Sequence, residues 1–174
     1  MAMSTAPKPV APVDYAAYNL AWAVLAAALL ASTKGSGPEP RELPVLGLAT
    51  FALSKGLAKE KAGTWAREPL TQASANGRRP KGTRLKYVAG ELITCTRCLG
   101  TWGSLGLVGL RVARPREGQI VAGVLAVAGI NDFLQALFAR TAEQANIAIA
   151  DADRADNEAK RARKRERKAA RENR

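Results

Sequence analysis

Apolar and charged residues are segregated into separate blocks along this chain instead of alternating. The run from Tyr15 to Ser32 carries no charge and has about the 20 residues that a helix needs to cross a hydrocarbon layer. Aromatic side chains gather at its start, as in the aromatic belt of a membrane interface. The whole pattern predicts an all-α membrane protein with three to four transmembrane helices, at residues 15–32, 43–58, 92–112 and 118–139. The block 43–58 is the shortest of the four, so whether it crosses the membrane completely stays open.

Polar segments separate and follow these blocks. Residues 71–86 combine Asn76-Gly77 and Pro80 with five basic side chains, which indicates a solvated loop. The segment 140–174 is rich in Ala and charge and has no Pro or Gly, a composition that favours helix. The organisation we expect is a disordered N-terminus (1–14), a helical membrane domain (15–139) and a basic helical tail (140–174).

Charge predicts the orientation of the spans. Of the 27 Lys and Arg residues, nine lie between Lys55 and Lys86 and eleven between Arg140 and Arg174. Four spans put both blocks on one side, and the positive-inside rule makes that side the cytoplasm. We therefore expect a multi-pass protein of the inner (cytoplasmic) membrane with both termini in the cytoplasm. The turn with Arg111, Arg114 and Arg116 falls outside, against the rule, and a re-entrant hairpin of the last two spans would ease that conflict.

The net charge and the lack of histidine limit the classes of function that the sequence allows. A net charge of +12 and a pI near 10.3 suit a phosphate-bearing surface, either anionic lipid headgroups or nucleic acid. The apolar blocks favour lipid. The chain has no His, which excludes a His-based catalytic triad and every His-ligated metal site.

A short motif lies at the start of the third block. The run ITCTRCLGTW contains Cys95, Cys98, Leu99, Gly100 and Trp102. With the upstream stretch LATFALSKGLAKEKAGTWAREPL, which ends in Arg67, Glu68 and Pro69, it resembles the Domain of Unknown Function 1360 family over roughly residues 43 to 139. The resemblance implies a small integral membrane protein of bacteria or their phages, with no established activity.

The two cysteines admit three interpretations. They could bind a metal such as zinc, with Glu91 and Asp132 or a second protomer completing the four ligands. They could form a redox pair at a helix N-terminus. They could also be small reduced thiols that pack in the protein interior. Asp132, as an ionisable group in an apolar block, needs a polar partner in any of these cases.

Glycines in the last two blocks predict close helix packing. Gly100, Gly103, Gly106 and Gly109 recur every third residue of one block, and Gly123, Ala126 and Gly129 form a similar ridge on the other. Small residues let helix backbones approach closely in a membrane. We expect these two ridges to face each other.

These patterns favour a non-enzymatic membrane protein whose basic loop and tail bind anionic headgroups or an acidic partner. Alternatives are a phage lysis protein of the holin type and a membrane thiol-disulfide oxidoreductase. Nucleic-acid binding by the tail would be non-specific, because the tail has no aromatic residues to stack on bases. The heptad-like alanines of the tail also leave a homo-oligomer possible.

Overall fold

The computed structural model describes residues 10–33, 37–74 and 77–172, and it confirms an all-α protein with one small β-hairpin. The predicted disordered N-terminus lies outside the described residues as far as Pro9. Pro12 to Asp14 are already helical, since Pro fits the first turn of a helix. In chain order the elements are α1 (Pro12–Thr33), η1 (Pro40–Glu42), α2 (Leu43–Ala58), η2 (Lys61–Gly63), α3 (Thr64–Arg67), β1 (Thr71–Ser74), β2 (Gly77–Pro80), α4 (Arg84–Thr94), α5 (Thr96–Ala113) and α6 (Pro115–Glu172).

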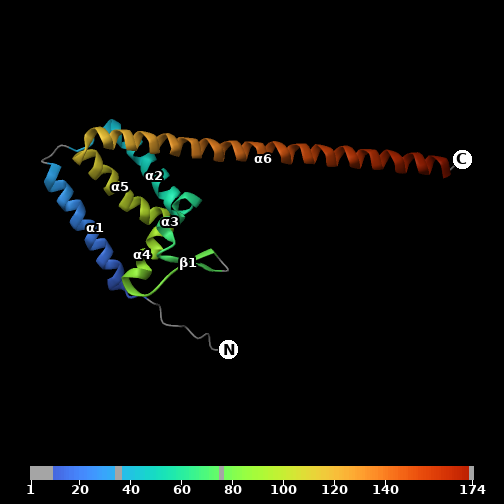
Figure 1. Cartoon of the computed structure of the whole chain (residues 1–174). Coiled ribbons are helices and arrows are strands. Elements are labelled where there is room, and N and C mark those ends of the chain that lie inside the picture. Colours follow the sequence, from blue (N-terminus) through green and yellow to red (C-terminus); the bar gives the residue numbers. More distant parts are fainter. Residues whose placement is uncertain (1–9, 34–36, 75–76, 173–174) are drawn as a thin grey trace, which may run out of the picture. The chain divides into compact units, whose positions relative to one another are not determined.

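The helix α5 packs against both α1 and α2 (Figure 1). Hydrogen bonds from side chains to backbone carbonyls show the relative directions of these helices. Tyr18 Oη donates to Leu85 O at 3.2 Å, and Trp22 Nε1 donates to Thr101 O at 3.1 Å, so α1 runs parallel to α4 and α5. Lys59, at the end of α2, donates to Thr94 O, just before the start of α5, so α2 runs antiparallel to α5.

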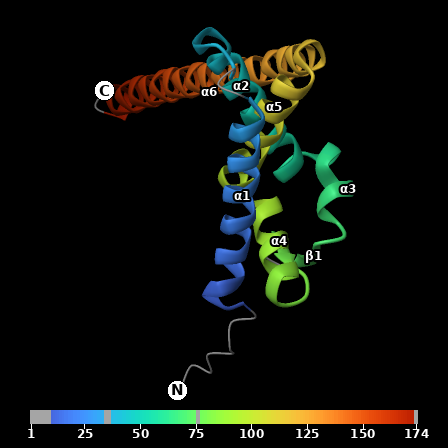
Figure 2. The same ribbon diagram turned by 90° about the vertical axis from the view of Figure 1, so that its left-hand side faces the viewer.

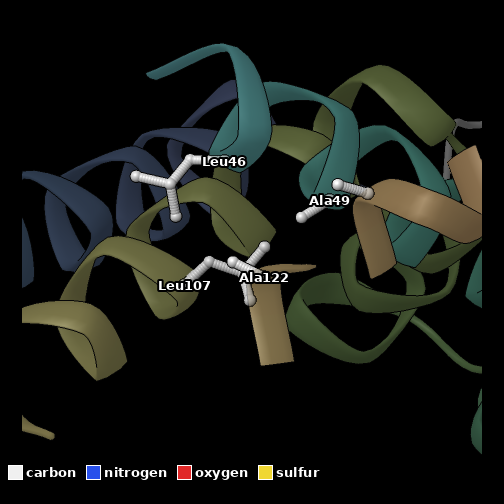
Figure 3. Packing of buried hydrophobic residues seen from close by; sticks show 5 residues of the cluster. Leu46, Ala49, Leu107 and Ala122 are labelled. Carbon is white, nitrogen blue, oxygen red and sulfur yellow. The ribbon is translucent and has the colours of Figure 1, made fainter. Parts of the chain in front are cut away.

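The buried core is small and joins α2, α5 and the beginning of α6. Figure 3 shows Leu46 of α2 and Leu107 of α5 pointing toward Ala122 of α6. Ala49, with no exposed surface, and Ala126, 5 % exposed, complete the cluster. Three of the five members are alanines, so the helices approach closely and each contact buries little apolar area.

The polar segment after α2 is more ordered than its composition indicates. We expected a solvated loop at 71–86, and that prediction is wrong, because β1 and β2 pair antiparallel with Thr71 opposite Pro80 and Ser74 opposite Gly77. Gly77 adopts φ +111°, a conformation that glycine tolerates without a side-chain clash. The hairpin packs against α4, which lies beside the N-terminal half of α1 (Figure 2).

Two of the four predicted spans lie in helices that are long and apolar enough to cross a membrane. In the described part of the chain these are α1 and the stretch Pro115–Ala155 of α6. The predicted boundaries 43–58 match α2, whose 16 residues are fewer than the roughly 20 of a full crossing. The prediction of one continuous helix at 92–112 is wrong, because the helix is interrupted at Cys95, which separates α4 from α5.

The chain divides into two compact units, Met1–Ile130 and Asn131–Arg174. The first contains the helical core and the hairpin. The second consists of the later part of α6, which remains helical through the Ala-rich, charged sequence as far as Glu172. Its alanines and long polar side chains are good helix formers, so no packed partner is required to explain the helix.

Candidate functional site

The Cys motif lies where the helical path is interrupted. Cys95 adopts φ −97° and ψ 107°, an extended conformation that ends α4 and begins α5. Its Sγ accepts a hydrogen bond from the Cys98 N–H at 3.3 Å. Cys95 is therefore the N-cap of α5, the place where a side-chain acceptor satisfies one of the N–H groups that a helix start leaves unpaired.

The two thiols lie beside each other. The sulfur atoms are 2.7 Å apart, and both cysteines are free and half-buried. Lys59, from the C-terminal end of α2, donates to Thr94 O at 3.0 Å, one residue before Cys95. The geometry thus brings a thiol pair, a helix N-terminus and an ammonium group to one place.

Glu91 and Asp132, the two carboxylates predicted to complete a metal site, have different surroundings. Glu91 accepts a hydrogen bond from the Tyr15 hydroxyl. Asp132 belongs to the second unit, Asn131–Arg174. Within the described residues no group of three or more Cys, His, Asp or Glu side chains is arranged to hold a metal ion. Zinc binding by Cys95 and Cys98 remains a prediction that needs ligands from elsewhere, such as a second copy of the chain.

The remaining motif residues contact neighbouring helices. The Trp102 ring meets Tyr18 of α1 edge-on, with centroids 6.3 Å apart and planes at 81°. A Cβ added at Gly100 would lie 3.8 Å from Ser54 Oγ of α2, and Leu99 N donates to Cys95 O at 2.9 Å in the first turn of α5. The motif therefore holds α5 against α1 and α2.

The glycine ridges approach α2, which differs from our expectation that they face each other. A Cβ at Gly103 would lie 3.5 Å from Leu53 Cδ2, and one at Gly129 would lie 2.9 Å from Leu48 O. A Cβ at Gly106, Gly109 or Gly123 would meet nothing within 4 Å. The physical reason is that α2 lies against both helices: Gly103 faces the side chains of Leu53 and Thr50, and Gly129 faces the backbone of Leu48 beside the small side chain of Ala52.

A buried arginine is a functional candidate that the sequence indicated only as part of the Arg-Glu-Pro element. Arg67 is 5 % exposed, and its guanidinium donates to Leu57 O at 2.6 Å and Glu60 O at 2.7 Å. Its Nε is the one buried side-chain N or O atom without a partner in the part of the chain that the structure describes. An unpaired buried donor costs about 1–3 kcal/mol. In the sequence, its position in the Arg-Glu-Pro element was the feature that could have identified Arg67 as a candidate.

An ion pair joins η1 to the last turn of α5, at the opposite end of that helix from the Cys motif. Arg111 Nη2 lies 2.7 Å from Glu42 Oε1, and both side chains are mostly buried. Glu42 also accepts from the Glu39 N–H at 2.9 Å. The backbone N–H of Glu39 and the guanidinium of Arg111 hold the pKa of Glu42 below its usual range, because both stabilise the charged carboxylate.

Comparison with known proteins supports the family assignment. Neither the curated proteins nor the solved structures include a significant match to the chain. The family model described as "Protein of unknown function (DUF1360)" matches residues 45–138, more than half of the chain. The matched region contains the Cys motif, Arg67 and the core of α2, α5 and early α6. The resemblance noted from the sequence is thus confirmed, and the chain belongs to the DUF1360 family of proteins of unknown function.

Proposed function

We propose that this chain is a non-enzymatic, multi-pass protein of the inner membrane whose basic hairpin and tail bind anionic lipid headgroups on the cytoplasmic side. Each basic residue near such a surface contributes about 1 kcal/mol of attraction, which salt screens. The hairpin presents Arg78 and Arg79 on β2, both exposed. The tail adds the sequence KRARKRERKAARENR.

One observation carries the membrane proposal: the large apolar side chains of the two long helices are exposed. In α1, Leu20 is 66 % and Leu30 73 % exposed, and in α6, Val127 is 68 % and Phe138 74 % exposed. A core helix of a soluble protein would be mostly buried, yet none of the apolar window of α1 is buried. Apolar surface of this extent favours contact with lipid.

The arrangement of charges supports the proposed orientation. The directions of α1, α2 and α5 bring the start of α1, the hairpin and the start of α4 to one end of the bundle. The other end carries Arg111 and Arg114, which pair with Glu42 at 2.7 Å and Glu117 at 3.7 Å. Both arginines therefore have carboxylate partners, but the positive-inside rule counts Lys and Arg and not net charge, so this outer turn still departs from it.

Cysteine labelling from the two sides of the membrane tests this proposal. In a Cys95→Ser, Cys98→Ser background, single cysteines replace Glu39, near the outer end, and Arg79, in the hairpin. We expect a membrane-impermeant maleimide to label Glu39→Cys in intact cells and Arg79→Cys only after lysis. Labelling of Arg79→Cys in intact cells would contradict the orientation, and abrupt growth arrest on induced expression would favour the holin alternative.

The thiol geometry favours one second candidate, thiol-disulfide exchange. With sulfurs 2.7 Å apart, Cys95 could attack an external disulfide, releasing one thiol of that partner. Cys98 would then displace the second, leaving a Cys95–Cys98 disulfide and a partner that has gained two electrons and two protons. Equilibration of the purified protein with glutathione redox buffers, followed by maleimide gel-shift, tests this. Thiols that stay reduced in fully oxidised glutathione would exclude it.

A further inference from the structure

A basic pocket lies between the end of α2, α3 and the hairpin. Its volume is about 500 Å³, and its lining residues are Ala58, Lys59, Arg67, Gly77, Arg78 and Thr94. Three of these six residues are cationic and none is acidic. Glu60, the carboxylate that follows Lys59 in the chain, pairs with Lys55 at 3.5 Å and does not line the pocket. The local charge therefore favours an anion.

Arg67 gives the pocket a fixed guanidinium. Its bonds to Leu57 O and Glu60 O hold the side chain at the C-terminal end of α2, and it is 5 % exposed. Neither partner carries a negative charge, so the positive charge of Arg67 is not neutralised by its own hydrogen bonds. Its Nε has no hydrogen-bond partner among the described residues, so the donors of this guanidinium are not all satisfied within the protein.

The other two cations are also held in place by neutral groups. Lys59 Nζ donates to Thr94 O at 3.0 Å, and Arg78 Nη1 donates to Thr71 Oγ1 at 3.1 Å. Thr71 Oγ1 in turn donates to Arg67 O at 2.9 Å. Arg and Lys arranged in this way provide several N–H donors for a tetrahedral oxyanion.

We propose that this pocket binds a phosphate group. The inference deepens the proposed function, because a lipid headgroup is the phosphate that a membrane would offer there. Trp65, in the same short helix as Arg67, is 74 % exposed, as expected for an aromatic residue at the depth of the headgroups. A free phosphate ion would use the same donors, so the experiment separates the two sources.

Two charge-matched double variants test the pocket. Lys59→Gln with Arg78→Gln removes two lining cations, and Lys61→Gln with Arg79→Gln removes two exposed cations that do not line the pocket. Binding of short-chain phosphatidic acid, and separately of inorganic phosphate, is measured by titration calorimetry on the full-length protein in neutral detergent micelles. We expect the first pair to weaken binding about tenfold. The second pair should weaken it less than about twofold, because a neutral micelle has no extended anionic surface for Lys61 and Arg79 to contact.

The outcomes are distinct. Binding of phosphatidic acid alone identifies the headgroup as the ligand, and equal binding of inorganic phosphate identifies the free ion. Equal losses in the two double variants would overturn the pocket while leaving diffuse attraction of lipid to the basic surface intact. Failure of the proposed function itself appears separately, as reversed maleimide labelling of Glu39→Cys and Arg79→Cys.

A measurement on the wild-type chain keeps the proposal testable if the first double variant does not fold. Phenylglyoxal modifies exposed arginines, and tandem mass spectrometry distinguishes Arg78 from its neighbour Arg79. We expect saturating phosphatidic acid or phosphate to slow modification of Arg78 and leave that of Arg79 unchanged. Equal protection of the two arginines, or protection of neither, would overturn the assignment of the pocket.

Discussion

At the scale of single residues, Cys95 shows how far a motif can be interpreted without coordinates. The spacing of Cys95 and Cys98 identifies the pair, but metal, redox and packing roles all share that spacing. The structure adds that Cys95 is extended and caps α5 through the Cys98 N–H. The interruption of the helix at Cys95 could not be predicted, because an apolar run without Pro contains no residue that indicates a change of backbone conformation.

The capping role predicts a difference between two substitutions of Cys95. Cys95→Ala removes the acceptor and should lower the free energy of unfolding by about 1 kcal/mol. Cys95→Ser supplies a better acceptor at the same position and should keep stability at or above the wild-type value. Unfolding in mixed detergent micelles, followed by circular dichroism, measures both. Equal destabilisation by Ala and Ser would contradict the capping role.

The pair of Glu42 and Arg111 predicts a pH dependence. The pKa of Glu42 is lowered in the folded protein, so below its usual pKa the unfolded state binds more protons than the folded state. The pair therefore stabilises the fold above that usual pKa, and the contribution is lost as pH falls through the lower, folded value.

The control for this pH dependence is Glu42→Gln, which cannot ionise. The difference in thermal stability between wild type and Glu42→Gln should be largest near neutral pH and should shrink as the medium becomes acidic. Melting temperatures of the two proteins in the same detergent, recorded across that range, give the answer. A difference that stays constant with pH would count against the ion pair.

At the scale of elements, α2 is the helix around which the first unit is organised. It packs against α5 and early α6, and Leu57 in its last turn accepts a hydrogen bond from Arg67. Its boundaries could be predicted from its apolar run, and Pro44 marks its first turn. Its central position could not, because glycine spacing shows that a close neighbour exists and does not identify which helix it is.

Two glycines of α6 test that arrangement. Gly129→Ala would place a methyl group 2.9 Å from Leu48 O, a backbone atom that must shift, and should destabilise the protein by about 1–3 kcal/mol. Gly123→Ala meets nothing within 4 Å and should be neutral or stabilising by up to about 1 kcal/mol, because Ala favours helix. Detergent unfolding compares them. Equal effects would mean that α6 does not approach α2 at Gly129.

The hairpin of β1 and β2 illustrates the opposite case, in which a local signal was present and was underweighted. The dipeptide Asn76-Gly77 in a polar segment is a hairpin signal in the sequence. The strands lack alternating apolar residues, so periodicity gave no support. Their stability comes from packing on α4 and from Thr71, which is 1 % exposed, and contacts of that kind are visible only in three dimensions.

At the scale of the whole molecule, segregated hydropathy was sufficient to predict the helical class and the two long apolar helices. Leu20 and Val127 illustrate why: they lie in uncharged runs and remain exposed after folding. The pocket around Arg67 was beyond sequence reasoning, because Lys59, Arg67 and Arg78 come from three different elements. Only the fold places them together.

The proposed function requires that the apolar surfaces of α1 and α6 are immersed in lipid. Alkaline carbonate extraction of membranes from cells that express the full-length chain tests this directly. We expect the protein to stay in the membrane pellet after high-speed centrifugation and to be released only by detergent, because its apolar side chains contact hydrocarbon. Recovery in the carbonate supernatant without detergent would contradict it.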